Sequence, residues 1–166
     1  MSQAFNVLVL CTGNSARSIL GEMLFNHLGQ GRIKAYSAGS KPGGVVNPVA
    51  IETLLKHGVP RDGARSKSWD EFSATAVPPA PTFDFIFTVC SNAANETCPV
   101  WPGHPTTAHW SLPDPAHVEP LDARRVAFET AYQSLKTRIE AFLALPLETM
   151  SRDEALAAAR KIHTEA

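Results

Sequence analysis

The chain has 166 residues, of which 44% are hydrophobic and 19% are charged, and its formal net charge is -1. This length suits one domain with a sizeable core, and the balanced charge argues against nucleic acid as a partner. The first apolar run, residues 5–10, is too short for the core of a secretory signal or for a membrane span. We therefore expect a cytoplasmic protein with no membrane and no nucleic-acid partner.

The N-terminal segment predicts a strand, a turn and a helix. Residues 5–10 are typical of a parallel strand that is buried on both faces. An amphipathic helix is expected from about Ala16, with Gly29 and Gly31 ending it. The apolar residues at helical spacing are Ile19, Leu20, Met23, Leu24 and Leu28.

Further strands and helices alternate along the chain. A second strand is expected at residues 33–37, and Asn47 with Pro48 predicts the start of a helix that runs to Lys56. A capping-box pattern at residues 68–71 predicts a short helix. Two more strands are expected, at residues 83–89 and 108–112.

The C-terminal third is predicted to be helical. A long helix is expected from Asp122, and Pro146 interrupts it. A second capping box, residues 151–154, predicts a final Ala-rich helix. The apolar stripe of the long helix is Val126, Leu135, Ile139 and Phe142. Such alternation of strands and helices predicts an α/β fold of three layers, an open parallel sheet with helices on both faces.

The three cysteines, Cys11, Cys90 and Cys98, do not form the even-numbered pattern of a disulfide framework. One reading of them is three buried, inert thiols. Metal binding is disfavoured, because Cys90 and Cys98 lack the close spacing of zinc pairs and no histidine cluster accompanies them. We expect no metal ion and no cofactor. Cys11 and Cys90 each follow a predicted strand, and ligands of open α/β sheets bind at such carboxyl ends.

The turn between Cys11 and Arg17 has the composition of an oxyanion cradle. Backbone N–H groups at a helix N-terminus have no intrahelical partner, and the helix dipole adds partial positive charge. Arg17 supplies a guanidinium fork for two oxygens of the anion. The same surroundings are expected to lower the pKa of the Cys11 thiol, which makes it a thiolate nucleophile. The expected anion-binding loop is Thr12, Gly13, Asn14, Ser15, Ala16 and Ser18.

Several motifs, in the same order, resemble the arsenate reductases that are related to low-molecular-weight protein tyrosine phosphatases. The resemblance covers Phe5 to about Phe142 and rests on "CTGNSARS", "YSAG", "NPVAIETL", "FDFIFTVC", "CPVWPG" and "HWSLPDPA". It implies a four-stranded parallel sheet and a covalent thiolate mechanism. We accordingly assign residues 1–146 to a phosphatase-like arsenate reductase domain. Residues 147–166 are then a C-terminal helical extension packed on the same domain.

The resemblance also implies a reaction sequence. Cys11 attacks arsenate, and Asp114, on a stiff Asp-Pro loop, protonates the departing oxygen. Cys90 then attacks the Cys11 sulfur and releases arsenite, and Cys98 attacks Cys90 and frees Cys11. The final Cys90–Cys98 disulfide would be reduced by thioredoxin. If Cys98 takes no part, a low-molecular-weight thiol with glutaredoxin, such as glutathione, could resolve the Cys11–Cys90 stage.

Two other functions fit the same loop. A phosphatase acting on phosphotyrosine or a small phosphate ester would use Cys11, Arg17 and Asp114 without a cysteine pair. A non-catalytic module would bind phosphate or sulfate in the loop, but the intact catalytic residues argue against it. Glu22 is expected to reach back towards Asn14 and Ser37 beneath the loop, and related reductases place a small cation near such groups.

Overall fold

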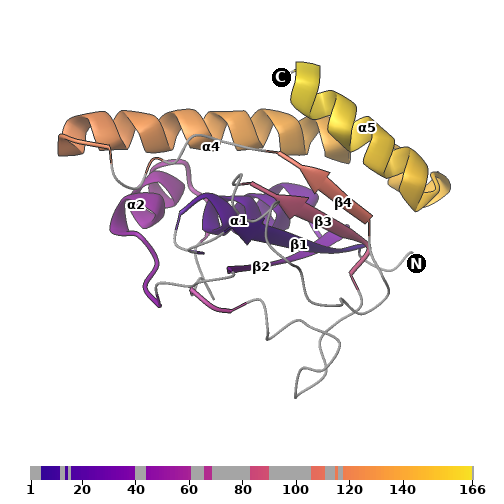
Figure 1. Ribbon diagram of the computed structural model, residues 1–166, viewed down its shortest axis with the longest axis horizontal. Coiled ribbons are helices and arrows are strands. Elements are labelled where there is room, and N and C mark those ends of the chain that lie inside the picture. The colour runs from indigo at the N-terminus through magenta and orange to yellow at the C-terminus, as the bar shows by residue number, and fades with distance from the viewer. Residues whose placement is uncertain are drawn as a thin grey trace.

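The computed structural model describes residues 5–11, 14, 16–39, 44–60, 66–68, 83–89, 106–110, 115 and 118–165 (Figure 1). Its strands are β1 (Phe5–Cys11), β2 (Ile33–Gly39), β3 (Phe85–Thr88) and β4 (Thr106–His109). Its helices are α1 (Arg17–Gly29), α2 (Pro48–Lys56), α4 (Leu121–Leu143) and α5 (Arg152–Glu165), with a short 3-10 turn at Leu147–Thr149. None of these helices combines the length and apolar character that a membrane span requires.

The four strands form one parallel sheet in the order β2-β1-β3-β4. The central strand β1 pairs with β2 from Phe5 opposite Ile33 to Cys11 opposite Gly39, and with β3 from Val7 opposite Phe85 to Leu10 opposite Thr88. All strands therefore end at the same edge of the sheet, as the sequence predicts for an open parallel fold. The expected α/β fold with a four-stranded parallel sheet is confirmed.

Strand β1 is buried on both faces because its side chains alternate between two apolar clusters. Val7, Val9 and Cys11 contribute to a large cluster that includes residues of all four described helices. Leu8 and Leu10 belong to a second cluster on the other face, with Ile86 and neighbouring residues. Cys11 therefore lies on the face of the sheet that α1 covers.

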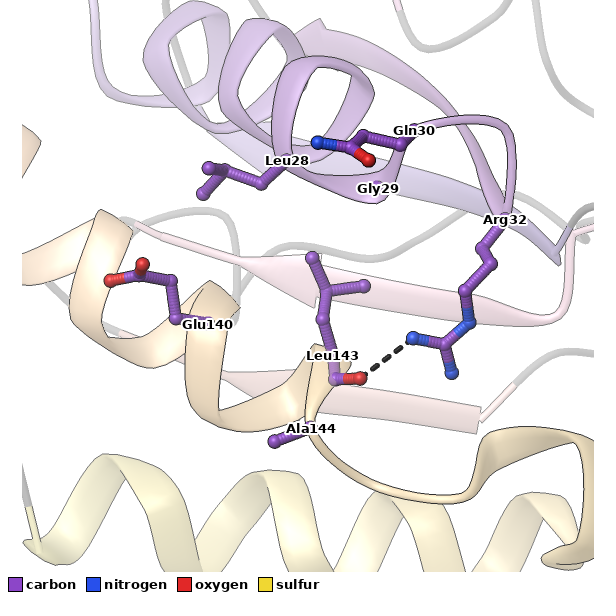
Figure 2. Close-up of a pocket in the computed structure, with 7 residues that line it drawn as sticks. All are labelled: Leu28, Gly29, Gln30, Arg32, Glu140, Leu143 and Ala144. Atoms are coloured by element: carbon purple, nitrogen blue, oxygen red, sulfur yellow. Dashed lines mark hydrogen bonds between the residues drawn. The ribbon is translucent and has the colours of Figure 1, made fainter.

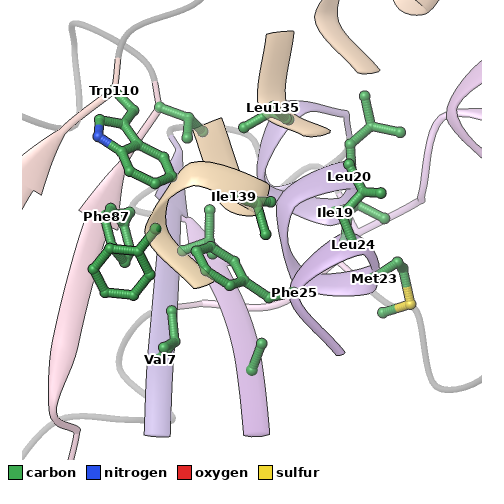
Figure 3. Close-up of a cluster of buried hydrophobic side chains, with 14 of the residues drawn as sticks. Val7, Ile19, Leu20, Met23, Leu24, Phe25, Phe87, Trp110, Leu135 and Ile139 are labelled. Carbon is green, nitrogen blue, oxygen red and sulfur yellow. The ribbon is translucent and has the colours of Figure 1, made fainter. Parts of the chain in front are cut away.

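Aromatic side chains occupy the centre of the larger cluster (Figure 3). The ring centroid of Phe87 lies 4.2 Å from that of Trp110 and 5.3 Å from that of Phe25. Phe142, on α4, meets Phe87 edge-on at 5.3 Å. These contacts join β3, α1, α4 and the end of β4, and buried aromatic pairs of this kind contribute about 0.5–1.5 kcal/mol beyond area burial. They fix the carboxyl end of the sheet against its helices.

Helix α1 differs from the predicted amphipathic helix. Every residue from Ser18 to Phe25 is buried, including the polar Ser18 and Glu22, so the first half of the helix has no solvent face. Gly21 allows the close approach, since an added Cβ would lie 3.0 Å from a methyl carbon of Val9. The predicted ending is confirmed, because Gln30 and Gly31 follow with positive φ angles of 44° and 89°.

The predicted starts of helices agree with the structure where the sequence contains a capping residue. The Asn47 side chain accepts from the Val49 N–H at 2.9 Å, with Pro48 in the first turn of α2. At the start of α5, the Ser151 N–H donates to Glu154 at 2.9 Å, and the Glu154 N–H donates to Ser151 Oγ at 3.1 Å. Both cap predictions are confirmed.

Boundaries that depend on pairing or packing are shifted. The second strand extends two residues further than expected, to Gly39, and the third is shorter, at Phe85–Thr88. The fourth strand was predicted at residues 108–112 but lies at Thr106–His109, so the two ranges share only residues 108 and 109. Val126 is 66% exposed, so its place in the apolar stripe of the long helix was wrong. Ser68 forms an isolated bridge with Gly39, and the rest of the helix predicted at 68–71 lies outside the described residues.

Helix α5 packs on β4 and α4 (Figure 1). The fully buried Trp110, directly after β4, donates from Nε1 to the Ala159 carbonyl at 2.8 Å. At the other end of the sheet, the Arg152 guanidinium contacts Asp84, which also accepts from the Asn6 N–H at 2.8 Å. Trp110 and Arg152 thus attach the helix at two points. The division of the chain at residue 146 stays a prediction.

Trp110→Phe is expected to lower the free energy of unfolding by about 2 kcal/mol, because it leaves the Ala159 carbonyl without the indole donor and opens a small cavity. Urea denaturation measures the change. Ala157→Ser, at an exposed position of α5, is the matched control and is expected to stay within about 0.5 kcal/mol of the parent. Equal stability of Trp110→Phe and the parent would contradict the anchoring role of the indole.

A charged cluster joins α2 to α4. The His57 ring stacks on Tyr132 at 4.1 Å, and its Nε2 lies 2.8 and 2.9 Å from the two Glu129 oxygens. Partial burial acts to raise the pKa of Glu129, but hydrogen bonds from Gln133, His57 and Lys56 outweigh it and bring the pKa down to about 2. The carboxylate therefore stabilises the fold in its ionised form.

Glu129→Gln is expected to reduce stability by about 1 kcal/mol at pH 7, a value discounted for solvent screening. Because the folded pKa lies below the usual 4.5, the Glu129 contribution is present above pH 4.5 and is lost as the pH falls towards about 2. The two stability curves should converge over that range in urea titrations. Glu52→Gln, which removes an exposed partner of Arg125, is the control, and a constant difference down to pH 2 would contradict the prediction.

Candidate active site

The turn between β1 and α1 lies where the sequence places it. Cys11 is the last residue of β1, forms no disulfide among the described residues and is 4% exposed. Arg17 is the first residue of α1. The predicted nucleophile and the predicted anion-binding arginine therefore stand at the two ends of one turn, at the carboxyl edge of the sheet. Thr12, Gly13 and Ser15 lie outside the described residues.

The N-terminus of α1 is suited to an anion. The residue before the helix, Ala16, offers no side-chain cap, and the first turn carries no acidic residue. The N–H groups of a first turn have no intrahelical acceptor, and the helix dipole is positive there. An oxyanion bound in the turn would satisfy these donors, and Arg17 would add a full positive charge.

Asn14 holds the turn from within. It is fully buried and adopts a left-handed conformation with φ of 46°, which asparagine tolerates better than most residues. Its Nδ2 donates to Ser18 Oγ at 2.8 Å and to Ser37 Oγ at 3.0 Å. Its Oδ1 accepts from the Lys67 N–H at 2.8 Å. One side chain thereby joins the turn to α1, to β2 and to residues 66–68.

A buried carboxylate lies behind Asn14. The Ser37 hydroxyl donates to Glu22 Oε1, which also lies 3.5 Å from Lys67 Nζ. The expectation that Glu22 reaches back towards Asn14 and Ser37 is confirmed, with Ser37 as the link. Lys67 was not anticipated, because an isolated lysine between two serines has no sequence signal for burial. Among the described residues, no cluster of acidic, histidine and cysteine side chains is arranged to hold a metal ion.

The neighbouring strands hold fixed points beside the turn. The Val89 N–H, directly after β3, donates to the Leu10 carbonyl at 2.9 Å. The Trp110 N–H, directly after β4, donates to the Thr88 carbonyl at 2.7 Å. Pro115 is buried. The other predicted catalytic residues, Cys90, Cys98 and Asp114, lie outside the described residues.

A separate pocket of about 490 Å³ lies at the opposite edge of the sheet, near the amino end of β2 (Figure 2). Arg32 is its obvious anion-binding group, but its guanidinium donates to the Leu143 carbonyl at 2.7 Å and to Glu148 at 2.9 Å. The Arg32 guanidinium is therefore already paired, and its contacts join the start of β2 to the end of α4. The pocket is therefore a structural junction. Its lining residues are Leu28, Gly29, Gln30, Arg32, Glu140, Leu143 and Ala144.

A model of the family described as low molecular weight phosphotyrosine protein phosphatase matches residues 6–156. The chain belongs to this family. Within it, the chain is 30% identical over 137 residues to an arsenate reductase of Shouchella clausii, a match that covers 82% of this chain and 93% of the relative. The predicted resemblance to arsenate reductases related to these phosphatases is confirmed.

Solved structures of both activities share the fold. An arsenate reductase of Archaeoglobus fulgidus has 27% identity and a TM-score of 0.59, over 81% of this chain and 98% of its own. A tyrosine phosphatase of Erwinia amylovora has 25% identity and a TM-score of 0.64, over 84% of this chain and 91% of its own. Likeness of fold therefore does not separate reduction from hydrolysis.

Asn14→Ala is expected to destabilise the protein by about 2–3 kcal/mol, because it removes three buried hydrogen bonds and places alanine at a positive φ. Asn14→Gly relieves the backbone but not the lost hydrogen bonds, so it should be about 1 kcal/mol more stable than Asn14→Ala. Urea denaturation measures both variants. An Asn14→Ala variant as stable as the parent would contradict the assigned role of this side chain.

Proposed function

We propose that the protein is an arsenate reductase in which Cys11 is the nucleophile and Cys90 the second thiol of the reduction. The single observation that carries this is the main-chain hydrogen bond between Leu10 and Val89, the residues that directly precede the two cysteines. The residues that precede Cys11 and Cys90 are therefore neighbours at the carboxyl edge of the sheet. The similarity to curated arsenate reductases supports the same reaction.

The first step uses the turn between β1 and α1. The Cys11 thiolate attacks arsenic, an S–As bond forms, and one oxygen leaves as water after Asp114 donates a proton. Arg17 and the first-turn N–H groups of α1 neutralise the anion during this exchange. The N-terminus of α1 and the Arg17 guanidinium favour the ionised thiol that the step requires.

The second step reduces arsenic. The Cys90 thiolate attacks the Cys11 sulfur, a disulfide forms, and the electron pair of the S–As bond stays with arsenic, which leaves as arsenite. Cys98 then attacks the Cys90 sulfur and frees the Cys11 thiolate. The resulting Cys90–Cys98 disulfide is reduced by the dithiol of thioredoxin. Such a cycle operates in a reducing compartment, which favours the cytoplasm.

The second candidate function is hydrolysis of phosphate monoesters. The family match and the shared fold of a tyrosine phosphatase favour it. The same thiolate, arginine and acid would form a phosphoenzyme, and water would complete the cycle without Cys90. Phosphate and sulfate have the tetrahedral shape of arsenate and would compete for the same turn. The two reactions therefore differ in their need for Cys90 and for a reductant.

Cys90→Ser is expected to abolish arsenite production, by at least about a hundredfold, because the Cys11–arsenate adduct then has no thiol to attack its sulfur. Any hydrolysis of p-nitrophenyl phosphate should persist, since Cys11 is the only cysteine that this reaction needs. Arsenite is measured with thioredoxin and its reductase or with glutathione and glutaredoxin. Cys11→Ser, as the reference for loss of the nucleophile, should abolish both activities.

Cys98→Ser is the matched control, since it removes the third cysteine of the chain and leaves Cys11 and Cys90 in place. Loss of the thioredoxin-coupled activity alone, with activity retained on glutathione and glutaredoxin, would support the relay as proposed. Full thioredoxin-coupled activity would remove Cys98 from it. If Cys90→Ser lost hydrolysis and reduction equally, the purely redox role of Cys90 would be wrong. If only phosphate esters were turned over, the reductase assignment would be wrong and the phosphatase function would take its place.

A further inference from the structure

Lys67 is an unusual residue for the interior of this protein. Its side chain is only 5% exposed, as against 68% for Lys56, and lysine is seldom buried unless it is paired. Its Nζ lies 3.5 Å from Oε1 of Glu22, a carboxylate that is itself 10% exposed. Removal of two charges from water costs free energy that their attraction does not always offset, so a buried pair is weak evidence for a purely stabilising role. The other contacts of the pair therefore bear on what it does.

Three contacts connect Lys67 to the turn that follows Cys11. Its N–H donates to Asn14 Oδ1 at 2.8 Å, and its carbonyl accepts from the Gly39 N–H at 2.9 Å. Gly39 is the β2 partner of Cys11 in the sheet. The third contact is the ion pair with Glu22, which reaches Asn14 through the Ser37 hydroxyl.

The direction of these hydrogen bonds depends on the charge of Glu22. Asn14 Nδ2 can donate to Ser37 Oγ because the Ser37 hydroxyl hydrogen is directed to a carboxylate that only accepts. The Lys67 ammonium lies 3.5 Å from the same Glu22 oxygen. It therefore helps to hold in place the carboxylate that orients the Ser37 hydroxyl and, through Ser37, the amide of Asn14.

We propose that Lys67 is a positioning residue for the oxyanion-binding turn: its buried ammonium fixes the Glu22–Ser37–Asn14 hydrogen bonds that hold the turn open for an anion. This rests on the proposed function, in which that turn binds the substrate oxyanion. The side chain acts through Glu22 and Ser37 and does not touch the anion. Lys67 therefore sets the affinity of the turn and the order of its backbone.

The test compares Lys67→Met, Lys67→Arg, Glu22→Gln and the double variant Glu22→Gln/Lys67→Met with the full-length parent. Lys67→Met keeps the length of the side chain and the main-chain N–H but removes the charge. In the double variant the amide oxygen introduced by Glu22→Gln can again accept from Ser37, with no buried charge left unpaired. Lys56→Met, which removes an exposed lysine of a surface ion pair, is the matched control.

Two readouts are used, and one needs no activity. Calorimetric titration with inorganic sulfate gives the affinity of the reduced protein for a non-reacting tetrahedral oxyanion. Amide hydrogen exchange over residues 11–20, without any anion, reports the order of the turn itself. We expect Lys67→Met to weaken sulfate binding by about tenfold or more and to accelerate exchange at the turn. Lys67→Arg and the double variant should recover much of the sulfate affinity and of the protection from exchange. Lys56→Met should match the parent in both measurements.

Other results would overturn the proposal. Parent-like sulfate affinity and exchange in Lys67→Met would show that the charge does not position the turn. If Lys67→Met fails to fold, a folded double variant with near-parent sulfate affinity supports the proposal, whereas loss of folding in both assigns Lys67 to general stability and overturns it. Absence of sulfate binding in the parent would instead count against the proposed function, and the exchange comparison would still decide the role of Lys67.

Discussion

One buried amide, the side chain of Asn14, sets the geometry of the proposed reaction centre. In the turn between β1 and α1, Asn14 adopts a positive φ of 46°, a backbone conformation that costs free energy by itself. Asn14 offsets that cost through hydrogen bonds to Ser18, Ser37 and the main chain of Lys67. Because these partners belong to α1, β2 and residues 66–68, the turn is only as well ordered as the packing of all three.

The parallel sheet supplies the second constraint. Its hydrogen bonds continue past the strands, from Val89 to Leu10 and from Trp110 to Thr88. The three segments that leave the carboxyl edge therefore start from fixed positions next to one another. A covalent relay needs such starting points, because each thiol exchange requires a nearly linear approach of the attacking sulfur. The aromatic cluster around Phe87 and Trp110 holds these points against α1 and α4.

The sequence predicts features that depend on local chemistry. Examples are the strand that ends at Cys11, the helix that follows it and the predicted end of that helix at Gly29 and Gly31. The caps at Asn47 and Ser151 are further examples. All of these depend on neighbouring residues, and each was confirmed. The fourth strand was misplaced because the apolar Trp110 and Leu112 suggested strand residues, whereas pairing with β3 sets its position at Thr106–His109.

Features that depend on distant partners were missed. Helical spacing groups Val126 with the apolar residues of α4, but it cannot show whether another element covers this side chain. In the structure Val126 is 66% exposed. Burial of Lys67 depends on Glu22, which lies 45 residues earlier in the chain. The predicted roles of Cys90, Cys98 and Asp114 stay predictions, since motif order and resemblance support them and all three residues lie outside the described part of the chain.

The ionic and polar groups behind the turn explain how one scaffold serves two reactions. Hydrolysis and reduction share their first step, attack by a thiolate on a captured tetrahedral anion, so both need the same ordered turn and arginine. The role that we propose for the Glu22–Lys67 pair concerns only that shared step. What distinguishes reduction is a second thiol placed to attack the first sulfur, and its position is governed by the chain that follows Val89. We therefore assign the step that separates the two reactions to the segment after Val89, and the step that they share to the turn, its buried amide and the ion pair behind it.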